Sequence, residues 1–418
     1  MNNSEKGGDN MYIKELTFEE FENFAKSNPL ENYMQTREYA RFMGELNFTY
    51  DFIGLLDESG QILAASLILF KKIYFNIKYG YAPKGFLINY YDQDLLNTFV
   101  TLLKDYYAKK NIAFIKINPE IVIGEIDNKS YNVFVNNNQT LKNTLQESGF
   151  TKLKDNIYFE SIEPRFNAYI NLKENSFENY SKTNRNKIKN STRKGLYLEI
   201  GEANNIDDVY KFFKTFKSLN YYRKLYDTFN SSNKIDLILV RVDFEQFIKN
   251  NQAIYEKEEE DNRLYNEIIQ RSRRKENLNR KMASDAKLCT IKNEIIYATE
   301  GLKEKNKAII AGALVIKSGN RVHIIESGFD PSYSNLNANY FLYNSIIEYY
   351  KKDYDYLDLN GITGDFTKEN VYRGLNRFKL GFNPKIYEYI GEFDLVLNKM
   401  NYEYLLNSGK LKQEFNKK

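Results

Sequence analysis

The order of predicted strands and helices in residues 62–118 recurs in residues 308–360, and this duplication constrains the fold more than any other feature. Each copy reads as two strands, a turn with proline, an amphipathic helix and a final strand. The offset of about 245 residues is well above the periods of solenoid repeats, so we predict two copies of one α+β domain. The corresponding segments are 62–71 with 308–317, 74–80 with 321–327, 81–84 with 329–333, 94–110 with 338–352 and 112–118 with 354–360.

The composition is that of a globular protein with roughly two or three folding units. The chain has 418 residues, 28% of them charged, and a formal charge of +4, which does not by itself predict a nucleic-acid binder. One cysteine, Cys289, and one histidine, His323, argue against a disulfide framework, a Cys/His zinc site and catalysis by a Ser-His or Cys-His pair. We expect no bound metal, and we interpret His323 as a core or sheet-face residue of a strand.

The hydropathy of the sequence predicts the cellular compartment of the protein. No segment offers the run of about 18 apolar residues that a membrane-spanning helix needs, and residues 1–10 lack the apolar core of a signal peptide. We therefore expect a cytoplasmic protein whose contact with a membrane is peripheral.

Residues 244–287 interrupt the second copy. The segment is highly charged, contains no glycine or proline, and spaces its apolar residues loosely as one seam. It predicts a helical hairpin packed as an antiparallel coiled coil, followed by a strand at 291–297. The expected division is a first domain at 12–163, a second domain at 164–243 and 288–398, a helical arm at 244–287, and tails at 1–11 and 399–418.

A candidate site follows the last repeated strand. Asp358 and Asn360 stand near the end of a strand that leads into Gly361 and Gly364, and such strand ends often face a crevice. Next along the chain come three cations with no acid among them, a composition typical of sites that hold anionic oxygen or of an ordinary basic surface loop. The cations are Arg373, Arg377 and Lys379.

Three segments resemble the Fem family, the aminoacyltransferases that build peptidoglycan interpeptide bridges. They are Gly-Leu-Asn-Arg-Phe-Lys-Leu-Gly-Phe at 374–382, Tyr-Ile-Gly-Glu-Phe-Asp-Leu at 389–395, and Tyr-Ala-Pro-Lys-Gly-Phe at 81–86, where Lys84 replaces the family's usual Arg and Phe86 its usual Pro. The resemblance implies two tandem domains like the Gcn5-related N-acetyltransferases. The glycine-rich turn that holds acetyl-CoA in those acetyltransferases is missing at 81–85 and 330–335, which disfavours an acetyl-CoA enzyme.

The resemblance also implies a reaction. An amino acid, expected to be Gly, Ala or Ser, would pass from aminoacyl-tRNA to an amine on the stem peptide of a lipid-linked peptidoglycan precursor. Because the ester on tRNA is already activated, the reaction needs no ATP, metal or cofactor, and aminoacyl-tRNA is a co-substrate. The partners are then the tRNA, the lipid-linked muropeptide and the inner face of the membrane.

Residue roles follow from the same resemblance. Lys379 is expected to stabilise negative charge, and Asp358 either accepts a proton or caps the following loop. Arg223 with Tyr226 is the best match to the pair that grips the diphosphate, in an expected helix at 209–229. The remaining candidates for substrate binding are Tyr222, Tyr333, Asn360, Arg377, Arg373, Arg41 and Lys84. Arg41 lies near Met43, which stands where the family has a phosphate-binding Lys.

Two readings compete with this one. The cation-rich run at 182–194 contains no acid and suits phosphates, although a solvated helix face has the same composition. One alternative is a non-catalytic tandem domain that uses this run to bind RNA or an anionic membrane. The other is a CoA-dependent N-acyltransferase. The resemblance to the Fem family implies that the arm contacts tRNA. Its mixed charges alone are equally typical of a solvated hairpin or of a contact between copies in an oligomer.

Overall fold

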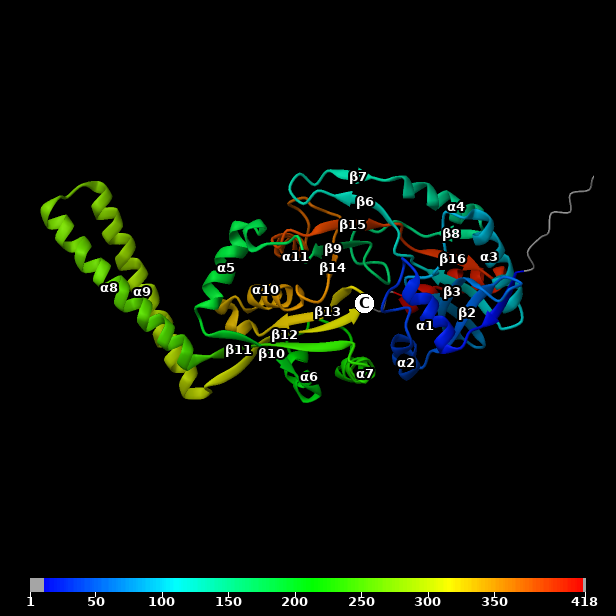
Figure 1. Cartoon of the computed structure of the whole chain (residues 1–418), viewed down its shortest axis with the longest axis horizontal. Helices are drawn as coiled ribbons and strands as arrows, with labels where there is room; N and C mark the ends of the chain where they lie inside the picture. Colours follow the sequence, from blue (N-terminus) through cyan, green and yellow to red (C-terminus); the bar gives the residue numbers. More distant parts are fainter. Residues whose placement is uncertain (1–10, 416–418) are drawn as a thin grey trace, which may run out of the picture.

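Two β-sheets lie side by side in the computed structural model, which describes residues 11–415 (Figure 1). The first sheet has seven strands, and most residues of its central strands are buried. In spatial order they are β1 (Tyr12–Glu15), β2 (Thr49–Leu56), β3 (Ile62–Tyr74), β4 (Ile77–Ala82), β5 (Ile112–Ile117), β16 (Phe393–Val396) and β8 (Phe150–Lys152).

The second sheet has nine strands and takes part of its edge from the first half of the chain. In spatial order they are β10 (Leu196–Gly201), β11 (Ile235–Asp243), β12 (Lys307–Ser318), β13 (Arg321–Phe329), β14 (Tyr356–Ile362), β9 (Phe166–Asn171), β15 (Lys385–Tyr389), β6 (Val122–Ile126) and β7 (Val133–Val135). Because β6 pairs with β15 while β16 pairs with β5, each sheet borrows strands from the other half. The expected boundary at 163/164 therefore does not separate the two sheets.

The repeated elements lie where the sequence predicts them. In the first sheet β4 and β5 are parallel and joined through helix α3 (Gln93–Tyr107), and in the second β13 and β14 are parallel and joined through α10 (Ala338–Tyr350). A parallel pair needs such a crossover helix. Both helices bury an apolar face against their sheet, and the fold is a mixed α+β arrangement.

The other helices frame these two units. Helix α1 begins with a capping box, in which the Thr17 side chain accepts from the Glu20 backbone N–H and the Glu20 side chain accepts from the Thr17 backbone N–H. The remaining bounds are α1 (Phe18–Ser27), α2 (Arg37–Glu45), η1 (Asn137–Thr140), α4 (Leu141–Glu147), η2 (Phe177–Asn179), α5 (Lys182–Thr192), η3 (Ala203–Asn205), η4 (Pro331–Leu336) and α11 (Arg373–Leu380).

The helix expected at 209–229 is two helices. Helix α6 (Ile206–Tyr210) ends early, and α7 (Leu219–Asn230) begins after Ser218, whose hydroxyl accepts a hydrogen bond from the Tyr221 backbone N–H at 3.2 Å. Ser218 is therefore the N-cap of α7 and marks the start of a separate helix.

The arm is longer than predicted. Helices α8 (Phe244–Arg271) and α9 (Lys275–Glu304) form a hairpin that projects from the second sheet (Figure 1). The strand expected at 291–297 is wrong, because these residues lie within α9 and the expected end at 287 falls too early. Ser284, Ile291 and Ala298 are the buried residues of α9 and recur every seventh position, so the seam facing α8 continues through the segment read as a strand.

The C-terminal segment is not a tail as far as Phe415. Helices α12 (Lys399–Asn407) and α13 (Lys410–Phe415) cover the first sheet, where Tyr402 and Leu405 are buried. The Tyr402 hydroxyl also donates a hydrogen bond to buried Asp394 at 2.9 Å. The sequence stretch looked polar because only one face of each helix is apolar. Residues 1–10 and 416–418, which complete the expected tails, lie outside the described residues.

This packing predicts a difference between two adjacent leucines. Leu405 has no exposed surface and Leu406 is 51% exposed, so Leu405→Ala should lower the free energy of unfolding by about 2–5 kcal/mol. Leu406→Ala, the matched control, should change it by about 0.5 kcal/mol or less. Urea unfolding of the two variants checks this. Equal effects would contradict the docking of α12 on the first sheet.

Across residues 11–415, no helix combines the length and the apolar character that crossing a bilayer requires.

Candidate active site

The strands β13 and β14 separate at the centre of the second sheet. They pair only at Arg321–Tyr356, Val322–Leu357 and His323–Asp358, although both strands continue further. Beyond that point the side chain of Asn360, at a positive φ of 67°, donates hydrogen bonds to the carbonyl oxygens of Ile324 and Ile325 at 3.3 and 3.4 Å. An opening between parallel strands of this kind is a usual place for a ligand.

Lys379 closes one side of this opening. It lies on α11, which is fixed to the segment after β14 because Asn376 and the backbone of Thr363 exchange hydrogen bonds at 3.1 Å. One turn later the ammonium of Lys379 donates to the carbonyl oxygen of Gly361 at 2.8 Å. Lys379 is 6% exposed. Burial lowers its pKa to about 8, against the opposing charges of Asp358 and Glu326.

Glu326 follows Ile325 on β13, next to the carbonyl oxygen that Asn360 binds. The register of β12 and β13 shifts next to it, since Leu314 pairs with Glu326 and Val315 with Ile324, which leaves Ile325 as an extra residue. Such a bulge re-aims the neighbouring side chain. Burial raises the pKa of Glu326, although the Tyr222 hydroxyl donates to its carboxylate at 2.7 Å. A half-buried carboxylate with a raised pKa beside a buried ammonium suits proton transfer.

Asp358 is held more tightly than Glu326. His323 Nδ1 lies 3.3 Å from its carboxylate, and the Asn360 backbone N–H donates to it at 2.7 Å. The pKa of Asp358 is lowered, because these contacts and the charge of Lys84 outweigh burial, which alone would raise it. Asp358 is therefore a fixed negative charge under the site and a weak base.

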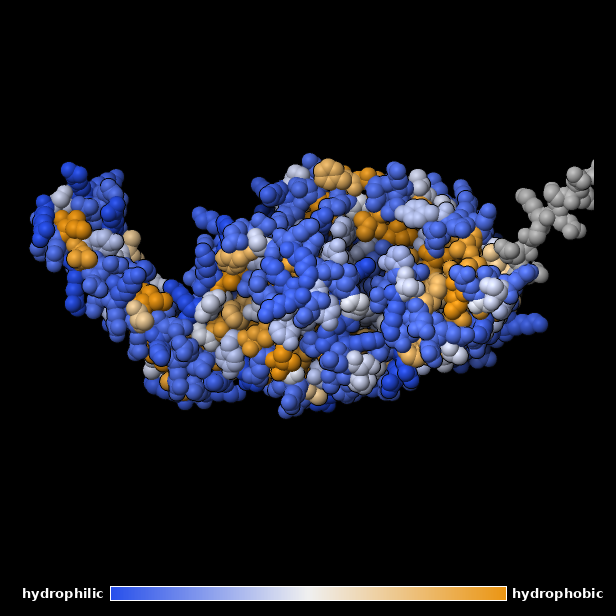
Figure 2. All heavy atoms as spheres, in the orientation of Figure 1, coloured by the Kyte–Doolittle hydropathy of each residue, from blue (hydrophilic) through white to orange (hydrophobic). Residues whose placement is uncertain are grey.

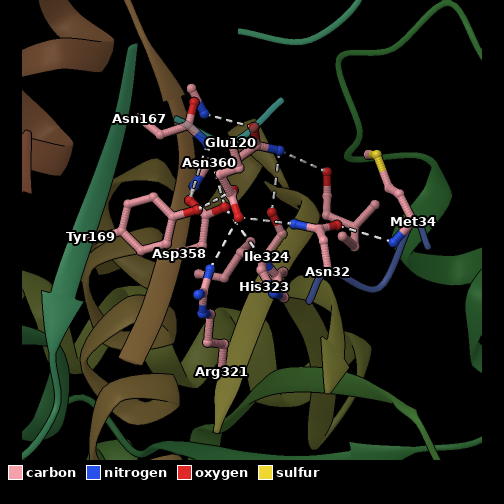
Figure 3. A network of polar contacts seen from close by, with 12 residues as sticks. Asn32, Met34, Glu120, Asn167, Tyr169, Arg321, His323, Ile324, Asp358 and Asn360 are labelled. Atoms are coloured by element: carbon pink, nitrogen blue, oxygen red, sulfur yellow. Dashed lines mark hydrogen bonds and ion pairs between the residues drawn. The ribbon is translucent and has the colours of Figure 1, made fainter. Parts of the chain in front are cut away.

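A polar network ties this site to the first sheet (Figure 3). Glu120, which follows β5, accepts hydrogen bonds from Arg321 at 3.0 Å, Tyr169 at 3.1 Å and Asn32 at 3.3 Å. Arg321 begins β13, two residues before His323. The network therefore fixes the position of β13 relative to residues 32 and 120 of the first half.

The structure brings together only some of the predicted residues. Lys379, Asp358 and Asn360 line the strand opening, and Tyr222 reaches it through Glu326. Lys84 is buried, its ammonium lies 5.3 Å from the ring centre of Tyr389, and it acts on Asp358 electrostatically.

The other predicted residues lie apart from this cluster. Arg223 is exposed and pairs with Asp207, its Nε 3.0 Å from the carboxylate, whereas Tyr226, one turn further along α7, is buried. Tyr333 packs towards Phe244 at the base of the arm. Arg41, Arg373 and Arg377 are exposed and form no ion pair with any residue in 11–415. Their roles in substrate binding stay predictions.

Sequence reasoning missed Glu326 and undervalued His323. Glu326 is the single acid of β13 and directly follows the apolar pair Ile324 and Ile325, and that irregularity is the signal that could have found it. His323 is buried as expected, but its Nε2 has no hydrogen-bond partner among the described residues, and its Nδ1 contacts Asp358. It therefore supports the site rather than only filling the core.

Comparisons with known proteins agree on one family. The FemAB family profile matches residues 16–407. The chain is 25% identical over 416 residues to aminoacyltransferase FemB of Staphylococcus epidermidis, covering 95% of this chain and 98% of the relative. It is 24% identical to lipid II:glycine glycyltransferase of Staphylococcus aureus strain MRSA252, covering 93% and 94%. The crystal structure of FemX superposes with a TM-score of 0.74 at 18% identity, covering 94% and 99%.

These findings bear on the predictions separately. The likeness to FemX supports the fold. The two relatives align along nearly their whole length, and the expected enzyme class, an aminoacyltransferase, is confirmed. Because a single profile covers residues 16–407, the chain belongs to the FemAB family.

Proposed function

We propose that the chain transfers an amino acid from aminoacyl-tRNA to an amine on the stem peptide of a lipid-linked peptidoglycan precursor. The observation that carries the proposal is the position of buried Lys379 where β13 and β14 separate, bound to the Gly361 carbonyl oxygen at 2.8 Å and within electrostatic reach of Glu326. The relative named lipid II:glycine glycyltransferase supports the choice of acceptor. The donated residue is proposed to be Gly, Ala or Ser, and no cofactor takes part.

The two residues divide the chemistry. The acceptor nitrogen attacks the ester carbonyl, and Glu326 accepts the proton that the nitrogen loses. Lys379 stabilises the oxyanion of the tetrahedral intermediate. When that intermediate collapses, the bond to the ribose oxygen breaks, the amide forms, and Glu326 returns its proton to the ribose oxygen. Asp358 and His323 hold the strand ends in place and do not exchange protons with the substrates.

We also infer the domain organisation of the chain and its location in the cell. The order β3, β4, α3, β5 matches the order β12, β13, α10, β14, and this supports two acetyltransferase-like domains with the arm inserted in the second. A lipid-linked acceptor places the enzyme at the inner face of the membrane, as a cytoplasmic protein in peripheral contact with it.

The pKa of Lys379 predicts an alkaline limit to the reaction. Because Lys379 stabilises negative charge only when protonated, kcat/KM should fall as the pH rises above about 8. Deprotonation of the acceptor amine acts in the opposite direction, so the sign separates the two groups. The Lys379→Arg enzyme should react more slowly, but its kcat/KM should not show this fall at alkaline pH, because arginine keeps its charge. If kcat/KM of Lys379→Arg falls at alkaline pH as in the parent, the titrating group is not Lys379.

Mass spectrometry of the muropeptide tests the proposed reaction. Purified protein is incubated with lipid-linked muropeptide and a mixture of aminoacyl-tRNAs, and the muropeptide is then analysed by mass spectrometry. We expect a gain of one or more aminoacyl residues that disappears after ribonuclease treatment of the tRNA. No gain, with both substrates shown intact, would refute the proposed function. A gain that survives ribonuclease would point to another acyl donor.

A further inference from the structure

Positive charge is concentrated at the end of the helical arm. We define the arm tip as residues 263–282, which comprise the last turns of α8, the connecting loop and the first turns of α9. The arm tip contains seven Lys or Arg and two Glu, so its formal charge is +5, whereas the whole chain carries only +4. The arm tip is therefore a distinct cationic surface on a nearly balanced protein.

The cations at the loop are not neutralised by the protein. Arg271, Arg273, Arg274 and Lys275 are all exposed, and no acid among residues 11–415 forms an ion pair with any of them. Further along α9 the cations are paired within the helix, as in Arg280 with Glu276 at 2.6 Å. Four cations within five residues, without ion-pair partners in the described chain, are available to an external anion.

Exposed apolar side chains accompany these cations. Leu264 and Ile268 on α8 are 51% and 41% exposed, and Leu278 and Met282 on α9 are 41% and 69% exposed. Each pair has i,i+4 spacing, so its members are neighbours on one helix. Figure 2 shows apolar atoms near the end of the arm, surrounded by hydrophilic ones. Both helices therefore present apolar surface within a few turns of the unpaired cations.

We propose that the arm tip docks on the surface of an anionic phospholipid bilayer. Cations next to exposed aliphatic side chains match the boundary between charged headgroups and acyl chains. RNA fits less well, because its phosphates would pair with the cations but would leave the four exposed aliphatic side chains without an apolar partner. The inference does not depend on the proposed reaction, since binding to lipid needs neither substrate.

The length of the arm suits this role. Helix α8 has 28 residues, which extend about 42 Å at 1.5 Å per residue. The arm tip is thus carried well away from the sheets (Figure 1), and it reaches a bilayer without covering the opening between β13 and β14.

Co-sedimentation of the full chain with vesicles tests the charge. We expect binding to equimolar phosphatidylglycerol and phosphatidylcholine, and little binding to phosphatidylcholine alone. The triple variant Arg273→Gln, Arg274→Gln, Lys275→Gln should bind the anionic vesicles roughly a hundredfold more weakly. The matched control, Lys292→Gln, Lys303→Gln, Lys305→Gln, changes three exposed cations nearer the arm base and should bind like the parent. Equal losses in the two triple variants would overturn the proposal.

Fluorescence tests the apolar contact. The chain contains no tryptophan, so Met282→Trp and Ile296→Trp each give a single reporter on the same helix. Ile296 is 52% exposed but lies towards the arm base. On anionic vesicles we expect the emission of Met282→Trp to shift to the blue and that of Ile296→Trp to stay unchanged. Absence of a shift at both positions, or an equal shift at both, would overturn the bilayer assignment.

Discussion

Lys379→Met should reduce kcat for aminoacyl transfer by about a hundredfold to a thousandfold, the usual effect of removing one group that stabilises an oxyanion. Lys379 is the buried cation at the opening between β13 and β14, and its ammonium is already held 2.8 Å from the Gly361 carbonyl oxygen. It therefore needs no reorganisation when charge develops in the transition state. Steady-state kinetics with aminoacyl-tRNA and muropeptide measure the effect, and KM should change by only a few-fold.

Two comparisons separate chemistry from folding in this experiment. Lys368→Met removes an exposed cation in the loop between β14 and α11, and it should keep the parent activity. Because Lys379 also binds Gly361, Lys379→Met is checked by urea unfolding, and Lys379→Arg should recover part of the lost kcat. A folded Lys379→Met enzyme with parent kcat would contradict the proposed role. A rise in KM with kcat unchanged would make Lys379 a binding residue instead.

The sequence predicted the repeated units because their signals are local. Short apolar runs and a crossover helix identify β12, β13, α10 and β14, and the segment around Lys379 stood out through its composition. The strand exchange was not predictable in this way. β6 is only five residues long, and it finds its place by pairing with β15, some 260 residues later in the chain. Such pairing depends on the tertiary fold, which local patterns do not encode.

Two errors have the same physical origin. Residues 291–297 are rich in isoleucine and read as a strand, but in α9 Ile291 is part of a seven-residue seam that packs on α8, and tertiary contact overrides local preference. Glu326 was overlooked, although it is the single acid of its strand. Its role depends on the bulge at Ile325 and on the separation of β13 from β14, neither of which leaves a mark in the sequence.

Glu326→Gln should lower kcat by about a hundredfold to ten-thousandfold, the range for loss of a general base. The amide is nearly the same shape and still accepts the hydrogen bond from Tyr222, so the strand opening should keep its geometry. Burial raises the pKa of Glu326, and the base must be ionised to act. In the parent enzyme kcat/KM should therefore fall as the pH drops through this raised pKa, and in Glu326→Gln that acid limb should vanish.

Two companion variants decide between a general base and a structural carboxylate. Glu125→Gln changes a half-buried glutamate on β6, whose nearest ion-pair contact, to Lys385, is 3.9 Å long, and it should keep both the rate and the acid limb. Tyr222→Phe removes the hydroxyl that lowers the pKa of Glu326, so it should move the acid limb to higher pH while most of kcat at neutral pH remains. If the limb stays fixed in Tyr222→Phe and persists in Glu326→Gln, the titrating base is another group and the role proposed for Glu326 is wrong.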